Sequence, residues 1–147
     1  MNDFIEILKQ YIQNAMDSNA DITKKINVCK AYKSNQTNAP KIVIYVVDDS
    51  EEERYNTFQG EQVSNLAVEI TAFTPQMKIG AVEYSAQDAA DKLSDMIRVL
   101  FQKEVIVNAI PDVLYVRRVG RTLAMPFDSG EKIYMSPVRF EILIKNK

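Results

Sequence analysis

Two stretches of the sequence alternate between apolar and polar residues, and this alternation constrains the fold more than any other feature. Residues 66–73 and residues 138–144 each place an apolar side chain at every second position. A period of two residues is typical of a β-strand that buries one face and exposes the other. The chain must therefore supply apolar cover for one face of a sheet.

Two amphipathic helices are the predicted cover. Residues 3–16 and residues 85–103 both carry apolar side chains at the spacing of a helical stripe. Ser85 precedes Asp88 by three residues, which is a capping pattern for the start of the second helix. Asp91 and Asp95 fall on the polar face of that helix and are predicted to have no special role.

The remaining strands complete the predicted sheet. The β-branched run 42–47 predicts a central strand that is covered on both faces. Shorter strands are predicted at 26–33 and 113–119, and Tyr55 and Phe58 suggest another that ends near Gly60. The expected fold class is α+β, a mainly antiparallel sheet with two helices packed against it. The length of 147 residues fits one domain over 1–147.

Composition argues against several classes of function. The net charge of −2 is unlike a general nucleic-acid binder, which needs an excess of Lys and Arg. The sequence has no histidine, the commonest general acid or base and zinc ligand, and its four glycines do not cluster into a phosphate-binding loop. We therefore expect neither catalysis nor a metal or cofactor.

The N-terminus and the single cysteine lead to two further expectations. The first residues lack the basic and apolar regions of a signal peptide, and the longest apolar run has only six residues. We accordingly expect no secretion and no insertion into a membrane. Cys29 cannot form an intramolecular disulfide, because there is no second cysteine, and is predicted to be a buried structural thiol.

An acidic run at 48–53 is the first candidate contact site. The favoured interpretation is a solvated turn or loop; the alternative is a hard cation, although the spaced ligands of a calcium loop are missing. The candidate residues are Asp48, Asp49, Glu51, Glu52 and Glu53.

A basic cluster and an apolar connection are the other candidates. Arg117, Arg118 and Arg121 lie within five residues, and the ordinary interpretation is a solvated cluster. If they have a function, contacts with a partner's carboxylates fit the negative chain better than DNA phosphates do. Met125 and Phe127 belong to an apolar connection at 121–135, which either packs on its own domain or is covered by a partner.

The order of elements resembles the tail terminator (tail completion) proteins of long-tailed bacteriophages. The resembling stretches are KIVIYVV at 41–47, VEITAF at 68–73, AQDAADKL at 86–93 and VRFEILI at 138–144. The predicted elements of the chain follow the order helix, three-strand antiparallel meander, helix and two or more closing strands.

The resemblance implies a virion structural protein of the phage neck, assembled in the host cytoplasm. Such a protein forms a homohexameric ring that caps the tail tube, stops its polymerisation and offers a joining surface to the head. The implied partners are copies of the chain itself, the major tail tube protein and a head-closure or connector protein. DNA passes through the ring without sequence-specific binding.

A closed ring requires a heterologous interface, in which two different surfaces of identical subunits meet. Exposed strand edges or the connection at 121–135 are the predicted sources of that interface. The acidic run and the arginine cluster are predicted to pair between neighbours.

Two alternatives remain open. The first is another head–tail joining protein of the neck, although portal adaptors are largely helical and head-closure stoppers are small β-barrels. The second is a small ligand-binding or enzymatic α+β domain, in which Asp, Glu, Lys or Tyr would act as acid or base.

Overall fold

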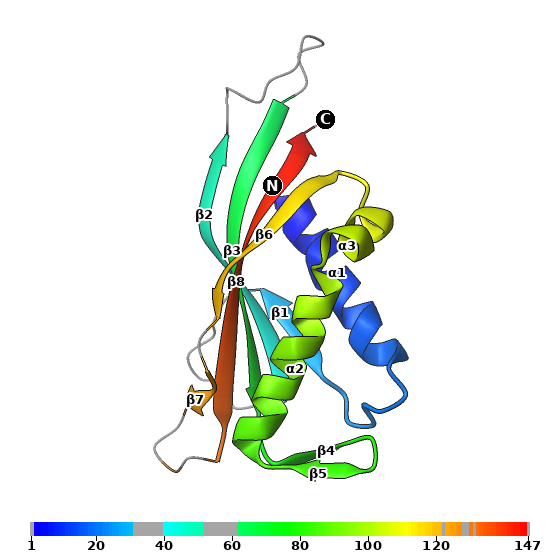
Figure 1. Ribbon diagram of the computed structural model, residues 1–147, viewed down its shortest axis with the longest axis vertical. Helices are drawn as coiled ribbons and strands as arrows, with labels where there is room; N and C mark the ends of the chain where they lie inside the picture. Colours follow the sequence, from blue (N-terminus) through cyan, green and yellow to red (C-terminus); the bar gives the residue numbers. More distant parts are fainter. Residues whose placement is uncertain are drawn as a thin grey trace.

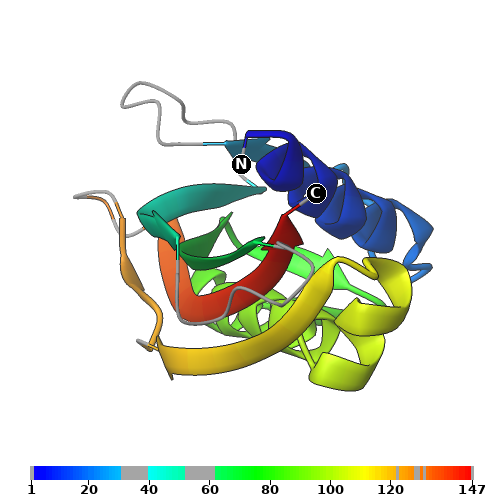
Figure 2. The same cartoon turned by 90° about the horizontal axis from the view of Figure 1, so that it is seen from above.

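One face of a strongly curved sheet is covered by helices, and the opposite face is the open one (Figures 1 and 2). The computed structural model describes residues 2–30, 40–51, 62–121, 123–127, 130 and 132–146. In this part of the chain it shows an α+β fold with three helices and a mostly antiparallel sheet. The elements are α1 (Asn2–Ser18), β1 (Asn27–Lys30), β2 (Lys41–Glu51), β3 (Gln62–Thr74), β4 (Met77–Ile79), β5 (Val82–Tyr84), α2 (Ala86–Leu100), α3 (Lys103–Ala109), β6 (Val113–Arg121), β7 (Met125–Pro126) and β8 (Tyr134–Asn146).

The main sheet has the strand order β1-β2-β3-β8-β6, and β7 pairs with β8 next to the end of β6. All of these pairings are antiparallel except β1 with β2, which is parallel and sets Asn27 opposite Lys41. Strand β1 is therefore an exception in a sheet that was predicted to be mainly antiparallel, and the strand predicted near Tyr55 and Phe58 lies outside the described residues. Alternation in a sequence shows which face of a strand is buried, but it carries no information about strand direction.

The core lies between the helices and the two longest strands, β3 and β8. The predicted alternation is confirmed, because the even-numbered residues over 66–72 and 138–144 are buried in the cluster that faces the helices. Helices α1, α2 and α3 each contribute fully buried aliphatic side chains to the same cluster. The central members are Leu8, Ile12, Leu66, Val68, Ile70, Leu93, Ile97, Ile106, Phe140 and Ile142.

Strand β2 differs from the prediction in two ways. The side chains of residues 41–44 are buried, whereas Tyr45, Val46 and Val47 are 45%, 37% and 40% exposed. The strand also continues through Glu51, where a loop was predicted, and pairs with β3 after a bulge between Val46 and Asp48. Backbone pairing with a long neighbouring strand here outweighs the low strand propensity of acidic residues.

The predicted second helix is shorter than expected, and a separate helix that was not predicted follows it. Its start is confirmed, since the Ser85 hydroxyl accepts a hydrogen bond from the Asp88 backbone N–H at 3.2 Å. However, α2 ends at Leu100, and α3 begins at Lys103. At the break, the ring of Phe101 turns into the core and stacks on Phe140, with ring centroids 4.5 Å apart. Burial of this ring explains why a continuous helix over 85–103 was wrong.

The hairpin of β4 and β5 was not predicted. Gly80 in its turn has φ of +67°, a backbone conformation that residues other than glycine rarely adopt. The Gly80 N–H donates a hydrogen bond of 2.7 Å to the carbonyl of Asp21. The hairpin is thereby attached to the connection between α1 and β1. None of the described helices is long and apolar enough to cross a membrane.

Tyr11 joins α1 to the break between α2 and α3. Its hydroxyl donates a 2.6 Å hydrogen bond to the carbonyl of Leu100, and its ring packs edge-on against Phe101. Burial raises the pKa of the Tyr11 phenol above its ordinary value. The neutral phenol is therefore the form that the folded state favours.

Replacing Tyr11 by Phe should lower the free energy of unfolding by about 1 kcal/mol at neutral pH, because one hydrogen bond is lost. Since the folded-state pKa is raised, this contribution is complete below about pH 10 and declines as the pH rises through that pKa. Urea denaturation from pH 7 to 11 measures the difference, with Tyr84→Phe as the control. A gap between the wild type and Tyr11→Phe that widens above pH 10 would contradict this assignment.

Candidate functional site

Exposed large apolar side chains gather on two opposite edges of the main sheet. Of the twelve such side chains found among the described residues, eight lie on β2 or on the segment from β6 to just after β7. The β2 edge, as named here, is residues 45–51; the β6 edge is residues 114–121. The eight side chains are Tyr45, Val46 and Val47 on the first, Leu114, Tyr115 and Val119 on the second, and Leu123 and Phe127 beyond it.

The β6 edge combines apolar side chains with two exposed arginines. The Arg117 guanidinium forms a 2.6 Å ion pair with the carboxylate of Glu141 on β8. Arg118 is aligned with Phe140, which faces the helices, whereas Glu141 faces the open side. The two arginines therefore belong to opposite faces of the sheet. Among the described residues, Arg118 forms no ion pair.

A row of alternating charges crosses the open face of the sheet. Glu69 on β3 accepts a 2.9 Å hydrogen bond from the guanidinium of Arg139 on β8, next to the pair of Arg117 and Glu141. Exposed ion pairs of this kind contribute little to stability. Their main effect is that positive and negative groups neutralise one another along this face.

The acidic candidates are only partly within the described structure. The backbone of Asp48, Asp49 and Glu51 belongs to β2, and the backbone of Arg121 belongs to β6, but the side chains of these four residues lie outside the described part. Glu52 and Glu53 also lie outside the described residues. The predicted contact between the acidic run and the arginine cluster of a neighbour stays a prediction.

The outer edge of β1 is closed by a side chain of α1. The Gln13 amide nitrogen donates to the carbonyl of Ile26 at 2.8 Å, and its amide oxygen accepts from the Val28 N–H at 2.9 Å. One carboxamide thus makes the two hydrogen bonds that a neighbouring strand would make at this point. The sheet is consequently capped at β1, and the two exposed edges lie elsewhere.

The connection between β6 and β8 is partly packed and partly exposed. Phe127 packs edge-on against the buried Phe73 on the open face, with ring centroids 4.9 Å apart, and half-buried Met125 aligns with Met135. Leu123, in contrast, is 76% exposed. The connection therefore packs on its own domain at Phe127, whereas cover of Leu123 by a partner stays a prediction.

Asp91 fixes this connection to α2. One carboxylate oxygen of Asp91 accepts hydrogen bonds from the Ala124 N–H and from the Ser136 hydroxyl, both at 3.2 Å. The prediction that Asp91 has no special role is wrong. Nothing in the helical pattern indicated it, because both donors lie more than thirty residues away along the chain.

Replacing Asp91 by Ala should destabilise the fold by about 2 kcal/mol, because a charged acceptor of two hydrogen bonds is lost. It should also accelerate tryptic cleavage after Lys132 in the released connection. Asp95→Ala is the matched control, since the Asp95 carboxylate lies 3.9 Å from Arg98 in an exposed pair of small effect. Equal unfolding midpoints and cleavage rates for the two variants would show that Asp91 does not hold the connection.

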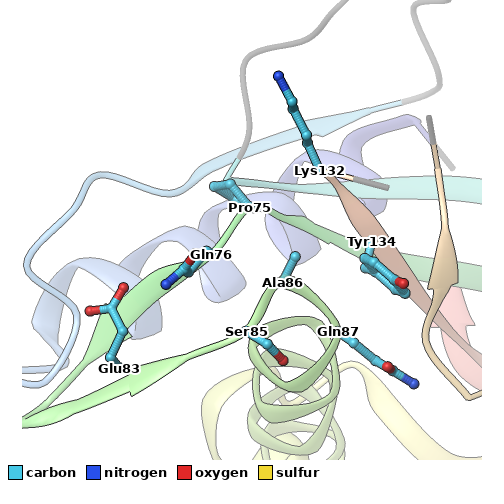
Figure 3. Close-up of a pocket in the computed structure, with 8 residues that line it drawn as sticks. All are labelled: Pro75, Gln76, Glu83, Ser85, Ala86, Gln87, Lys132 and Tyr134. Carbon is cyan, nitrogen blue, oxygen red and sulfur yellow. The ribbon is translucent and has the colours of Figure 1, made fainter. Parts of the chain in front are cut away.

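An open hollow of about 700 Å³ lies at the N-terminus of α2, beside the β4–β5 hairpin (Figure 3). Its charged side chains do not converge, because Glu83 and Lys132 lie on opposite sides of the hollow. An arrangement of acid, base and bound substrate needs groups within hydrogen-bonding reach of one point. The lining residues are Pro75, Gln76, Glu83, Ser85, Ala86, Gln87, Lys132 and Tyr134.

The described residues contain no group of three or more His, Cys, Asp or Glu side chains placed to hold a metal ion. Cys29 lies half-buried on β1. Neither a comparison with models of known protein families nor a search of curated proteins returns a match for this sequence. Within the described part of the chain, the two exposed edges are the features that bear on function.

Proposed function

We propose that this chain is a structural subunit that assembles into a closed ring, and that the ring is a phage tail terminator. The observation that supports this proposal is the presence of two different exposed edges on opposite sides of one sheet. A contact between unlike surfaces is heterologous, and heterologous contacts close into rings when the rotation between neighbours divides a full turn.

The composition of the edges disfavours a two-fold dimer. Two β6 edges brought together antiparallel would set the arginines of one copy close to those of the other, and like charges on neighbouring strands are destabilising. The β2 edge meets the same objection, because Asp48, Asp49 and Glu51 belong to it. A basic edge and an acidic edge are complementary only when they come from different sides of the molecule.

The shape of the sheet supports the proposal that the ring contacts other proteins at its ends. The last residues of β2, the first residues of β3 and the end of β8 extend past the helices (Figure 1). In the proposed function, one end of the ring contacts the major tail tube protein and the other contacts a head-closure or connector protein. Two unlike ends are what a terminator needs in order to bind a tube without allowing further growth.

The first test is assembly and its effect on a tube. With a chain mass of 16.8 kDa, six copies correspond to about 100 kDa, which light scattering coupled to size-exclusion chromatography measures directly. Added to polymerising tail tube protein, the chain should shorten the tubes and label their ends in electron micrographs. Tubes of unchanged length and unlabelled ends would refute the terminator function, whereas rings without an effect on tubes would indicate another neck component.

The second test concerns Arg118, which is exposed and forms no ion pair among the described residues. Arg118→Glu should weaken assembly by about tenfold or more, because a favourable charge contact between neighbours becomes repulsive. Lys92→Glu on the exposed face of α2 is the control with the same change of net charge. Both variants should keep the unfolding midpoint of the wild type.

Unchanged assembly of Arg118→Glu would remove the ionic contact from the proposal. A loss of assembly in both variants would instead indicate a general effect of net charge, which high salt should then reverse.

A further inference from the structure

We propose that Leu123 of one copy packs against strand β1 of a second copy, and that this contact joins neighbours in the ring. The inference rests on the proposed ring and names a contact that forms it. Leu123 is 76% exposed, the highest value among the large apolar side chains of the described residues. Moving such a side chain out of water is favourable, because the free energy follows the apolar area that is covered.

The backbone on both sides of Leu123 is held in place by its own chain. Before it, Arg121 pairs with Val138 at the end of β6. After it, the Ala124 N–H donates a hydrogen bond of 3.2 Å to the carboxylate of Asp91. A side chain on a backbone that is already ordered loses less conformational entropy when a partner covers it. Leu123 is therefore a preorganised contact residue.

Ring closure fixes the level at which Leu123 meets its neighbour. The two unlike edges face sideways, so the ring axis runs roughly along the strands. A closed ring has no translation along its axis, and residues of neighbouring copies that touch therefore lie at one level. Strand β1 and the end of β6 lie at the same height along the longest axis in Figure 1, and on opposite sides of the molecule in Figure 2. The side that carries Leu123 thus faces the side that carries β1 in the next copy.

Backbone pairing gives the same level residue by residue. One row of aligned residues runs across the sheet from Arg121 to Lys30, and a second row runs from Met125 to Asn27. The first row is Arg121, Val138, Ile70, Ile44 and Lys30, and the second row is Met125, Met135, Phe73, Lys41 and Asn27. Leu123 lies midway between the two rows along the chain, so it is level with the middle of β1.

The receiving surface on the second copy contains Cys29 and Tyr45. Val28 belongs to the core, so Cys29, the next residue along β1, lies on the open face, where it is aligned with Val43. Tyr45 follows two residues after Val43 on the same face and is 45% exposed. Diagonal neighbours on adjacent strands lie within reach of one bound side chain. A half-buried thiol and an exposed aromatic ring together offer a mainly apolar surface to a leucine.

Side chains, and not backbone groups, supply the contact at β1. The Gln13 carboxamide already bonds the carbonyl of Ile26 and the N–H of Val28 on the outer edge of this strand. A leucine needs no backbone partner, so it can contact β1 without displacing Gln13. Phe127 is a weaker candidate for the same role, because its ring packs on Phe73 of its own chain.

Disulfide crosslinking to the native thiol tests the proposed contact. In the variant Leu123→Cys, the new cysteine of one copy is placed beside Cys29 of the next. Within one chain the two positions are separated by four strand spacings, about 19 Å along the sheet, which is too far for a disulfide. Mild oxidation should therefore give a ladder of crosslinked multimers on a non-reducing gel.

Two controls accompany this variant. Leu123→Cys/Cys29→Ser lacks the receiving thiol and should give no ladder. Val82→Cys keeps Cys29 and places an exposed cysteine on the β4–β5 hairpin, so it should give at most traces. A ladder that needs both positions supports the contact, whereas crosslinking that survives Cys29→Ser contradicts it.

A second variant tests the contact without a new cysteine. Leu123→Asp places a charge where the contact buries an apolar side chain, and an unpaired charge is costly to remove from water. Assembly should weaken about tenfold or more, with an unchanged unfolding midpoint, because Leu123 is exposed in its own chain. Val82→Asp is the control with the same change of charge at another exposed valine or leucine position. Light scattering over a range of concentrations provides the measurement.

The outcomes separate this inference from the proposed function. A ladder that depends on Cys29, together with weakened assembly of Leu123→Asp, supports the contact. Weakened assembly without a ladder overturns the placement of Leu123 on β1. Rings that form normally, show no ladder and tolerate Leu123→Asp overturn the contact and leave a ring subunit in place. A chain that is monomeric at every concentration and has no effect on tail tubes overturns both.

Discussion

The arrangement of the molecule depends on the ring of Phe101 at the break between α2 and α3. It stacks on Phe140 of β8 and packs edge-on against Tyr11 of α1. One side chain at the end of α2 therefore contacts both the sheet and a second helix. The Tyr11 hydroxyl then satisfies a carbonyl at the end of α2, where helices leave acceptors unpaired. Because this contact ends α2 and starts α3, it also sets where the chain enters β6. The position of the β6 edge relative to the helices follows from it.

The chain covers the margin of its own sheet at two places and leaves it exposed at two others. At β1, a glutamine side chain replaces the missing strand. Along the connection after β6, the Asp91 carboxylate holds the backbone of Ala124 against α2, and Phe127 covers Phe73 on the other face. At the β2 and β6 edges, apolar side chains are exposed instead. Sheet proteins usually protect edges that have no partner, so the exposure of the β2 and β6 edges supports the proposal that they contact a partner.

The sequence predicted those features that depend on local periodicity. Alternation over 66–73 and 138–144 identified the buried faces of β3 and β8, and the Ser85 and Asp88 pattern identified the start of α2. Features that depend on distant residues were not predicted. The parallel direction of β1, the end of α2 at Phe101 and the hydrogen bonds of Asp91 all arise from contacts between segments remote in sequence.

The sequence identified the candidate contact residues, but it did not predict how they are arranged in space. Arg117, Arg118, Met125 and Phe127 lie at or next to the β6 edge, whereas Asp48, Asp49 and Glu51 were assigned to a loop. Their low strand propensity concealed that they extend β2, because the pairing with β3 that holds them there is not a local property. The sequence pattern therefore found the composition of the two edges, while their positions on opposite sides of the sheet required the structure.

The alternating row of Glu69, Arg139, Glu141 and Arg117 has a consequence for anything that moves past the open face. Tight adhesion of a duplex depends on cationic groups that displace its condensed counterions, and guanidinium groups already held by carboxylates offer few such exchanges. In a ring whose sheets turn this face inward, the wall would bind a polyanion only weakly. Traffic through such a channel would depend only weakly on ionic strength.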